Sequence, residues 1–229
     1  MWLSTSIQLA RNDDMWKTVF LNLNMNKILC LLLMLISSHL FAQKIFNQPN
    51  AKGTWQYVYP FQDKSYVLAI QNGINEKEPV GEDINTNIYF GKSSPTADTI
   101  FWKEQVYLKL INDNISYEDY NGDGVKDIVI FSETGGRGGN AFYHLFLLAP
   151  KNKKIIRVKN FENIVNPEYN RKHKVIVSYG LSGTNHYSIY KISKDNRAFQ
   201  IGKSFEDTFD SDPTELDKRI IKILKKSVY

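Results

Sequence analysis

Apolar and polar residues alternate along most of the chain beyond residue 54. This period of two is typical of β-strands that bury one face, and many of the alternating residues are aromatic or β-branched. We expect strands over residues 54–59, 65–70, 87–90, 99–102, 105–111, 127–131, 141–148, 174–179, 187–192 and 199–205. Gly, Pro, Asn and Asp separate these runs at short intervals. The pattern predicts a mostly β fold, an antiparallel β-sandwich or barrel-like single domain.

Residues 141–148 form the longest apolar run within this pattern. A nearly continuous apolar run indicates a strand that is buried rather than half-exposed. The sequence shows no internal repeat at the spacing of a solenoid or propeller. We therefore expect a single β-rich domain over residues 44–229.

The pattern changes near the C-terminus, where it predicts a short amphipathic helix. Asp212 suits the N-cap, Pro213 the first helical position and Glu215 the third. The apolar residues expected on one face of this helix are Leu216, Ile220, Ile221 and Leu224. Packing of this face on the sheets is the favoured interpretation, and a basic helix on a membrane surface is the alternative.

The N-terminus carries an export signal. A basic start at Met25 and Lys27 is followed by a short apolar stretch and by Ala42, which suits cleavage by signal peptidase. We therefore interpret residues 25–43 as a signal peptide and residues 1–24 as a mis-annotated gene start. The alternative is an uncleaved membrane anchor. Cleavage would leave no stable membrane span and would place the protein in the periplasm or outside the cell.

Composition and charge restrict the class of protein further. The 229 residues are 42% hydrophobic, with a net charge of +5. Removal of residues 1–43 takes away three basic and two acidic side chains, which leaves a mild net charge of +4. We therefore expect no nucleic-acid partner. The one cysteine, Cys30, lies in the signal, so the mature chain has neither disulfides nor thiolate metal ligands.

Residues 119–127 match the first nine positions of an EF-hand-type loop for Ca²⁺, which prefers oxygen ligands. Gly124, at the sixth position, permits the sharp turn. The predicted ligands are the side chains of Asp119, Asn121 and Asp123, the backbone carbonyl of Val125, and Asp127, directly or through water. The alternative is a tight turn rich in Asp and Asn that holds no ion.

The twelfth position of this loop, usually a glutamate that binds with both oxygens, is Ile130. It belongs to the apolar strand over residues 127–131, so the loop precedes a strand instead of a helix. We expect weak binding, with a structural role for the ion. The glycine-rich residues 133–140 follow, and we interpret them as a hairpin connection beside the ion loop.

Signatures of catalysis are missing from the sequence. There is no zinc-binding His spacing and no Gly-x-Ser-x-Gly turn. His144 lies in an apolar run, which favours a core role. We predict no catalytic residues and no enzyme, although a carboxylate pair of the glycosidase kind needs geometry to be recognised.

Residues 179–187 join two alternating strands and are small and polar, with aromatic residues at their edges. Such a loop on a rigid sheet is a common binding surface. We predict a partner-binding loop with Ser182, Gly183, His186 and Tyr187 as contact residues. An ordinary hairpin loop is the alternative.

Several of these features, in this order, resemble a family of periplasmic β-sandwich proteins. The family includes type IV secretion immunity proteins and relatives of inhibitors of invertebrate-type lysozyme. The likeness runs over residues 116–192. It rests on the 119–127 loop with its strand, the glycine-rich segment before the aromatic strand 142–146, residues 166–170 with strand 175–179, and a glycine-containing loop before Tyr190 and Lys191.

The resemblance implies inhibition of a peptidoglycan hydrolase by a loop that plugs its cleft. Lysozyme inhibitors often carry Ser-Gly-x-x-Tyr in that loop, whereas Ser182 to Tyr187 is one residue longer. The mature chain is mildly basic, although an inhibitor of a basic lysozyme is expected to be acidic. Two alternatives stay open: a Ca²⁺-stabilised surface or ligand-binding domain without a hydrolase target, and an envelope enzyme.

Overall fold

The computed structural model describes residues 44–46, 52–73, 84–109, 114–135, 139–208 and 213–226. The predicted gene-start segment 1–24 and signal peptide 25–43, with Cys30, lie outside these residues, as does the predicted helix N-cap Asp212.

The described strands form three antiparallel sheets, each of four strands that follow one another in chain order. The first sheet contains β1 (Thr54–Val58), β2 (Tyr66–Asn72), β3 (Thr86–Lys92) and β4 (Thr99–Val106). The central sheet contains β5 (Ile115–Glu118), β6 (Asp127–Thr134), β7 (Ala141–Ala149) and β8 (Lys154–Val158). The third sheet contains β9 (Pro167–Asn170), β10 (Val175–Ser182), β11 (Thr184–Ile192) and β12 (Ala198–Glu206). Short 3₁₀ helices η1 (Pro150–Asn152) and η2 (Phe161–Asn163) flank β8, and helix α2 (Pro213–Lys226) follows β12.

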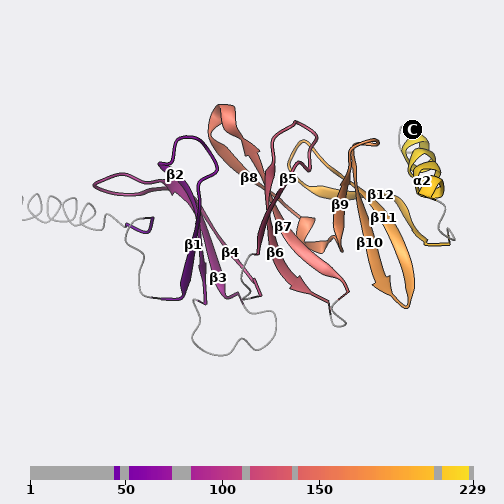
Figure 1. Ribbon diagram of the computed structural model, residues 1–229, viewed down its shortest axis with the longest axis horizontal. Helices are drawn as coiled ribbons and strands as arrows, with labels where there is room; N and C mark the ends of the chain where they lie inside the picture. Colours follow the sequence, from indigo (N-terminus) through magenta and orange to yellow (C-terminus); the bar gives the residue numbers. More distant parts are fainter. Residues whose placement is uncertain are drawn as a thin grey trace, which may run out of the picture.

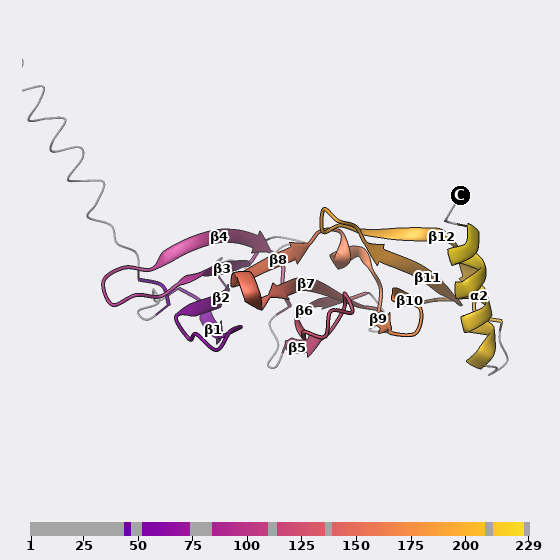
Figure 2. The same cartoon turned by 90° about the horizontal axis from the view of Figure 1, so that it is seen from above.

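The three sheets lie one after another along the long axis of the molecule, and α2 lies at the far end (Figure 1). The view from above shows the same order (Figure 2). Each described sheet keeps two edge strands, so none closes into a barrel. The mostly β prediction is confirmed, and the arrangement is compatible with a single sandwich-type domain.

Alternation along the strands divides the core between the two faces of the central sheet. Ile128 and Ile130 of β6 pack toward the first sheet, whereas Val129 packs toward the third. In β7, Phe146 faces the first sheet and Leu145 the third. Because successive strand residues point to opposite faces, a sheet packed on both sides needs apolar residues at every position. The nearly continuous apolar run at 141–148 therefore indicated burial correctly.

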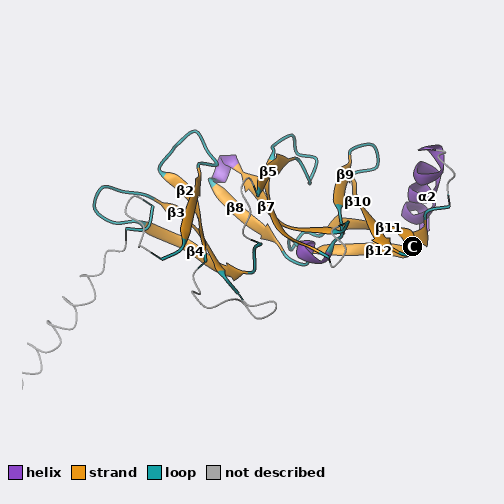
Figure 3. Cartoon of the chain, turned by 60° about the horizontal axis from the view of Figure 1, so that its bottom comes forward, coloured by secondary structure: helices purple, strands orange, loops and turns teal. Residues whose placement is uncertain are grey.

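Both outer faces of the stack are covered as well. Ile45 and Phe46 pack on the first sheet, and their backbone N–H groups donate to one Asp98 oxygen at 2.6 and 2.8 Å. Helix α2 covers the third sheet at the other end, where Figure 3 shows it in purple. Its fully buried residue is Ile220. Of the four residues predicted on its inner face, Ile221 is 41% exposed, and Ile223 packs on the sheet instead.

The strand predictions were wrong in two respects. Within the predicted strand 105–111, residues 105 and 106 belong to β4, which runs without interruption from Thr99 to Val106, residues 107–109 are not strand, and residues 110–111 lie outside the described residues. Three strands were missed: β5, β8 and β9. All three are edge strands of their sheets, and edge strands are short and partly solvated, so their sequences show little apolar periodicity. The succession of three four-stranded meanders is a structural repetition that the sequence did not reveal.

Candidate functional site

The predicted ion loop connects β5 to β6 and curls around the carboxylate of Asp119. One oxygen of Asp119 accepts a hydrogen bond from the Gly122 N–H at 2.7 Å, and the other accepts one from the Gly124 N–H at 2.9 Å. Both glycines have positive φ, +75° and +84°. Glycine adopts this conformation without steric cost, so the sixth position makes the turn that the sequence pattern requires.

The side chains at the third and fifth positions order the exposed part of the loop. Asn121 Oδ1 accepts from the Asp123 N–H at 2.9 Å, and Asp123 Oδ1 accepts from the Val125 N–H at 2.7 Å. The Asn121 amide donates to Asp123 Oδ2 at 2.9 Å. The loop thus holds two carboxylates, one amide oxygen and one backbone carbonyl within seven residues, which are the oxygen ligands that Ca²⁺ prefers.

Asp127 at the ninth position is placed differently. Its side chain is fully buried, and its two oxygens accept from the N–H groups of Tyr120 and Leu148, each at 3.0 Å. Burial raises the pKa of Asp127 to about 6, although these two hydrogen bonds act against the rise. The described structure therefore shows Asp127 fixing the loop to β7. Its role as an ion ligand stays a prediction.

The loop also packs on the third sheet. The Tyr120 hydroxyl donates to the Pro167 carbonyl at 2.8 Å, and a Cβ on Gly122 would lie 2.4 Å from the Tyr169 hydroxyl. The loop accordingly spans the junction of two sheets. Among the described residues, no group of three or more His, Cys, Asp or Glu side chains could hold a metal ion. The fit to Ca²⁺ thus rests on Asp119, Asn121, Asp123 and the Val125 carbonyl.

The described part of the glycine-rich segment does not lie beside the ion loop. The ion loop enters β6 at Asp127, whereas the glycine-rich segment leaves it after Thr134. An eight-residue strand spans roughly 26 Å, so the two connections lie at opposite ends of β6. The prediction of a shared location was wrong because it took closeness in sequence for closeness in space.

The described part of the glycine-rich segment instead packs on the β10–β11 hairpin. The Asn140 amide donates to the Leu181 carbonyl at 3.1 Å, and its oxygen accepts from the Leu181 N–H at 2.8 Å. The Asn166 amide donates to the carbonyls of Gly139 and Tyr179 at 3.0 and 2.9 Å. Two asparagines therefore hold the hairpin next to the end of β6.

The segment predicted as a partner-binding loop is mostly strand. β10 and β11 remain paired up to Ser182 and Thr184, and Gly183, with φ +76°, makes the turn. Ser182 and Gly183 thus lie at the tip, where Leu181 and Thr184 are exposed. Residues 180–182 pair with residues 184–186, so the predicted loop continues both strands instead of looping out.

His186 and Tyr187, the other two predicted contact residues, lie within β11. His186 Nδ1 is 2.7 Å from the Thr184 carbonyl oxygen. The half-buried Tyr187 ring contacts the rings of Tyr179 and Phe205, with centroids 4.7 and 5.6 Å away. The structure thus brings Ser182, Gly183 and His186 near the tip and places Tyr187 against the core beneath α2.

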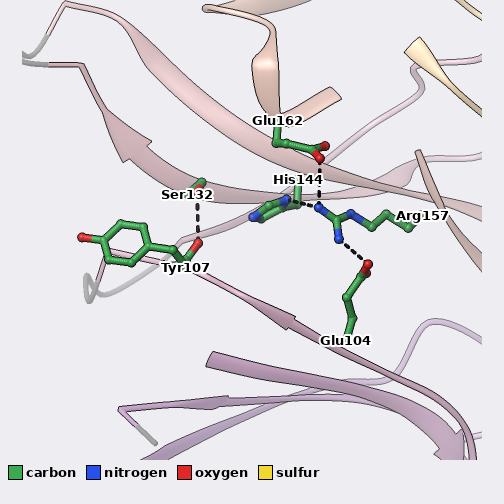
Figure 4. Close-up of polar contacts among 6 residues, drawn as sticks. All are labelled: Glu104, Tyr107, Ser132, His144, Arg157 and Glu162. Atoms are coloured by element: carbon green, nitrogen blue, oxygen red, sulfur yellow. Dashed lines mark hydrogen bonds and ion pairs between the residues drawn. The ribbon is translucent and has the colours of Figure 1, made fainter. Parts of the chain in front are cut away.

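A second polar cluster lies between the first and central sheets (Figure 4). The Arg157 guanidinium on β8 pairs with Glu104 on β4 and with Glu162 on η2, the latter at 3.3 Å. The same group lies 3.2 Å from His144 Nδ1 on β7. Since an arginine only donates hydrogen bonds, His144 accepts at Nδ1 and carries its proton at Nε2.

His144 is buried and neutral in this cluster. Burial, followed by the positive charge of Arg157, lowers its pKa to about 4. The core role predicted for His144 agrees with this placement. Sequence reasoning did not find Glu104, Arg157 or Glu162, because the residues are far apart in the chain and Arg157 lies on a missed edge strand. The cluster holds two sheets together through one guanidinium.

Comparison with known proteins does not assign the chain to a family. No protein-family model and no curated protein matches the chain. A solved structure of a Xanthomonas type IV secretion system related protein aligns over 74% of this chain and 87% of its own, with 18% sequence identity and a TM-score of 0.39. This likeness is too distant to assign a function or a partner.

No helix in the described part of the chain is both long and apolar enough to cross a bilayer. The described helix α2 packs its apolar face on the third sheet, as expected.

Proposed function

We propose that the chain is an exported binding module that inhibits a peptidoglycan hydrolase, with the tip of the β10–β11 hairpin as the contact element. The observation that carries the proposal is the hairpin itself. Its turn at Gly183 is exposed, while Asn140 and Asn166 fix its backbone from outside the hairpin. An exposed element that is already ordered loses little conformational entropy when it enters a cleft.

The chemistry of the tip suits a cleft that binds peptidoglycan. Leu181 offers an exposed apolar surface, and the neighbouring Thr184 offers a hydroxyl. The ordered backbone presents both at a fixed spacing. Ser182 and His186 complete the predicted contact set, and Tyr187 supports the hairpin from the core side.

Ca²⁺ has a structural role in this proposal. The ion loop lies at the start of β6, opposite the end where the hairpin is fixed, so the ion does not touch the hydrolase. Asp119, Asn121, Asp123 and the Val125 carbonyl would hold it. A hard cation there would order the loop, which connects two strands of the central sheet and packs on the third sheet.

The test is a turbidity assay of peptidoglycan hydrolysis by several lysozyme types, including the invertebrate type, with the purified mature protein. We expect Leu181→Asp to raise the half-inhibitory concentration by about tenfold or more, since contact residues at the centre of an interface cost more than about 1.4 kcal/mol when lost. Phe199→Asp is the matched control. Phe199 is 47% exposed, against 41% for Leu181, and lies outside the hairpin.

The proposal would be contradicted if the protein inhibited no lysozyme type and no hydrolase were recovered with it from envelope extract. An equal loss in both variants would show that the hairpin tip is not the contact element.

A further inference from the structure

A basic groove runs between the edge strand β12 and helix α2, separate from the hairpin tip and the ion loop. Its volume is about 490 Å³. The lining residues come from one stretch of β12 and from one face of the helix: Gly202, Lys203, Ser204, Phe205, Arg219, Lys222, Ile223 and Lys226. None of these residues belongs to the contact set proposed above.

A bulge in β12 shapes one wall of the groove. Pairing with β11 passes from Tyr187–Phe205 directly to Ile189–Ile201, so three residues of β12 lie opposite the single residue Ser188. Gly202 begins the bulge with φ +69°, and a Cβ there would lie 3.0 Å from Ile223 Cγ2. Glycine adopts this φ without steric cost and leaves room for the close approach of the strand and the helix. The bulge carries Lys203 and Ser204 into the groove.

The helix supplies the other wall. Arg219, Lys222 and Lys226 are spaced by three and four residues, which places them on one helical face. None of these three, nor Lys203, forms an ion pair with a described residue.

Three nearby described carboxylates are engaged elsewhere, and a fourth, Glu206, does not line the groove. Glu215 pairs with Lys218 at 2.8 Å, and Asp217 pairs with Lys172 and His173. Asp207, which follows β12, accepts a hydrogen bond from the Tyr179 hydroxyl at 2.9 Å. Four cations consequently converge on the groove without compensation from these acids. A concave surface lined by one sign of charge attracts ligands of the opposite sign.

The lining also has an apolar part. Phe205 and Ile223 line the groove together with the cations, and the Phe205 ring stacks on Tyr187. Strand β12 is the last of its sheet, and the outer edge of such a strand is able to pair with an added extended segment. A bilayer is flat, so it would bind a basic surface that is convex. The cations of this groove line a concave surface instead.

We propose that this groove binds an extended acidic segment of a partner protein, with carboxylates on the four cations and an apolar side chain against Phe205 and Ile223. The proposal is independent of hydrolase inhibition, since the groove shares no residue with the hairpin tip. It gives the protein a second docking surface for a partner of opposite charge.

The test uses the mature protein and a fluorescent eight-residue peptide of alternating glutamate and leucine, followed by anisotropy. We expect Arg219→Gln/Lys222→Gln to weaken binding about fivefold or more, from the loss of two charge pairs. The matched control is Lys218→Gln/Lys225→Gln, which removes the same charge from the same helix outside the groove and is expected to change affinity less than about twofold. Melting temperatures of both variants check that the fold is kept.

Two altered peptides test the chemistry without any variant. Replacement of glutamate by glutamine is expected to abolish binding, and replacement of leucine by glycine to weaken it. Equal weakening by both double variants, or equal binding of the glutamine peptide, would overturn the proposal. A further test is competition with anionic vesicles that contain one-fifth phosphatidylglycerol. If the vesicles displace the peptide, and this displacement depends on Arg219 and Lys222, the proposal is overturned and the ligand is a membrane surface. Inhibition of lysozyme by the groove variant is expected to remain unchanged.

Discussion

At the scale of the residue, two buried titratable side chains of the central sheet bind other parts of the protein. Asp127 accepts backbone hydrogen bonds from Tyr120 and Leu148. His144 accepts from Arg157, which also holds carboxylates from β4 and η2. Each side chain thus links segments that are distant in sequence, and each predicts a measurable effect on stability.

Replacement of Asp127 by alanine would leave two buried N–H groups without an acceptor. Each unsatisfied buried group costs about 1–3 kcal/mol. We expect Asp127→Ala to lower the free energy of unfolding by about 2–4 kcal/mol, measured by urea denaturation. The exposed neighbour Lys126 is the control, and Lys126→Ala should change this free energy by less than about 0.5 kcal/mol. Similar values for the two variants would contradict the role assigned to Asp127.

His144 predicts how stability depends on pH. Burial, the main cause, lowers the pKa of His144 from its ordinary value of 6.5 to about 4 in the folded protein. Between these two values the unfolded chain binds the proton and the folded chain does not, so stability falls as the pH falls. The free energy of unfolding should decrease by about 3 kcal/mol between pH 7.5 and pH 4 on account of His144.

The measurement compares urea denaturation of the wild type with that of His144→Gln at both pH values. Titrations that the two proteins share cancel in the difference, so a shallower pH dependence in the variant reports His144. The same dependence in both proteins would show that the histidine does not resist protonation.

At the scale of the element, helix α2 closes the outer face of the third sheet through a few apolar contacts. Ile220 is completely buried, and the adjacent Ile221 is 41% exposed. We expect Ile220→Ala to cost about 3 kcal/mol of stability, because it leaves a cavity. Ile221→Ala should cost less than about 0.5 kcal/mol. Urea denaturation of this pair tests the packing, and equal costs would place the helix differently.

The ion loop is the element for which we predict a stability that depends on a ligand. If its affinity for Ca²⁺ lies near 10⁻⁴–10⁻³ M, then about 10 mM Ca²⁺ stabilises the folded state by about 1.4–2.7 kcal/mol. We expect the melting temperature to rise with Ca²⁺ and to fall again with a chelator. The Asp119→Asn/Asp123→Asn variant should lose this response. An identical melting temperature in Ca²⁺ and in chelator would favour the alternative, a tight turn rich in Asp and Asn that holds no ion.

At the scale of the whole molecule, the central sheet couples the two ends of the stack. The Trp102 and Phe146 rings stack between the first and central sheets, with centroids 5.8 Å apart. The Trp102 indole also donates a hydrogen bond to the Ile155 carbonyl at 3.3 Å. On the opposite face, the central sheet packs on the third sheet. Cores that share one sheet are expected to unfold together.

The coupling predicts a single unfolding transition. Within residues 44–229, which the experiment uses, both tryptophans, Trp55 and Trp102, lie on the first sheet, so their fluorescence reports that end. Circular dichroism at 222 nm reports the helix at the other end. The two curves should coincide in urea, as in a two-state transition. Loss of the helical signal at lower urea than the fluorescence change would show that the third sheet unfolds independently.

The sequence by itself determined the β class, most of the interior strands, the C-terminal helix and the glycine positions of the ion loop. These follow from local rules: alternation on a pleated strand, the 3.6-residue period of a helix, and the freedom of Gly124 to adopt positive φ. Apolar residues on both faces of 141–148 even indicated a sheet covered on two sides.

Only the tertiary structure decided how the strands divide into three stacked sheets and which edge strands complete them. It also decided that the hairpin tip lies beside Asn140, that Arg157 meets Glu104 and His144, and that β12 and α2 enclose a basic groove. These contacts join residues from different strands or separate segments of the chain. Their partners are set by sheet packing, which no local pattern of residues specifies.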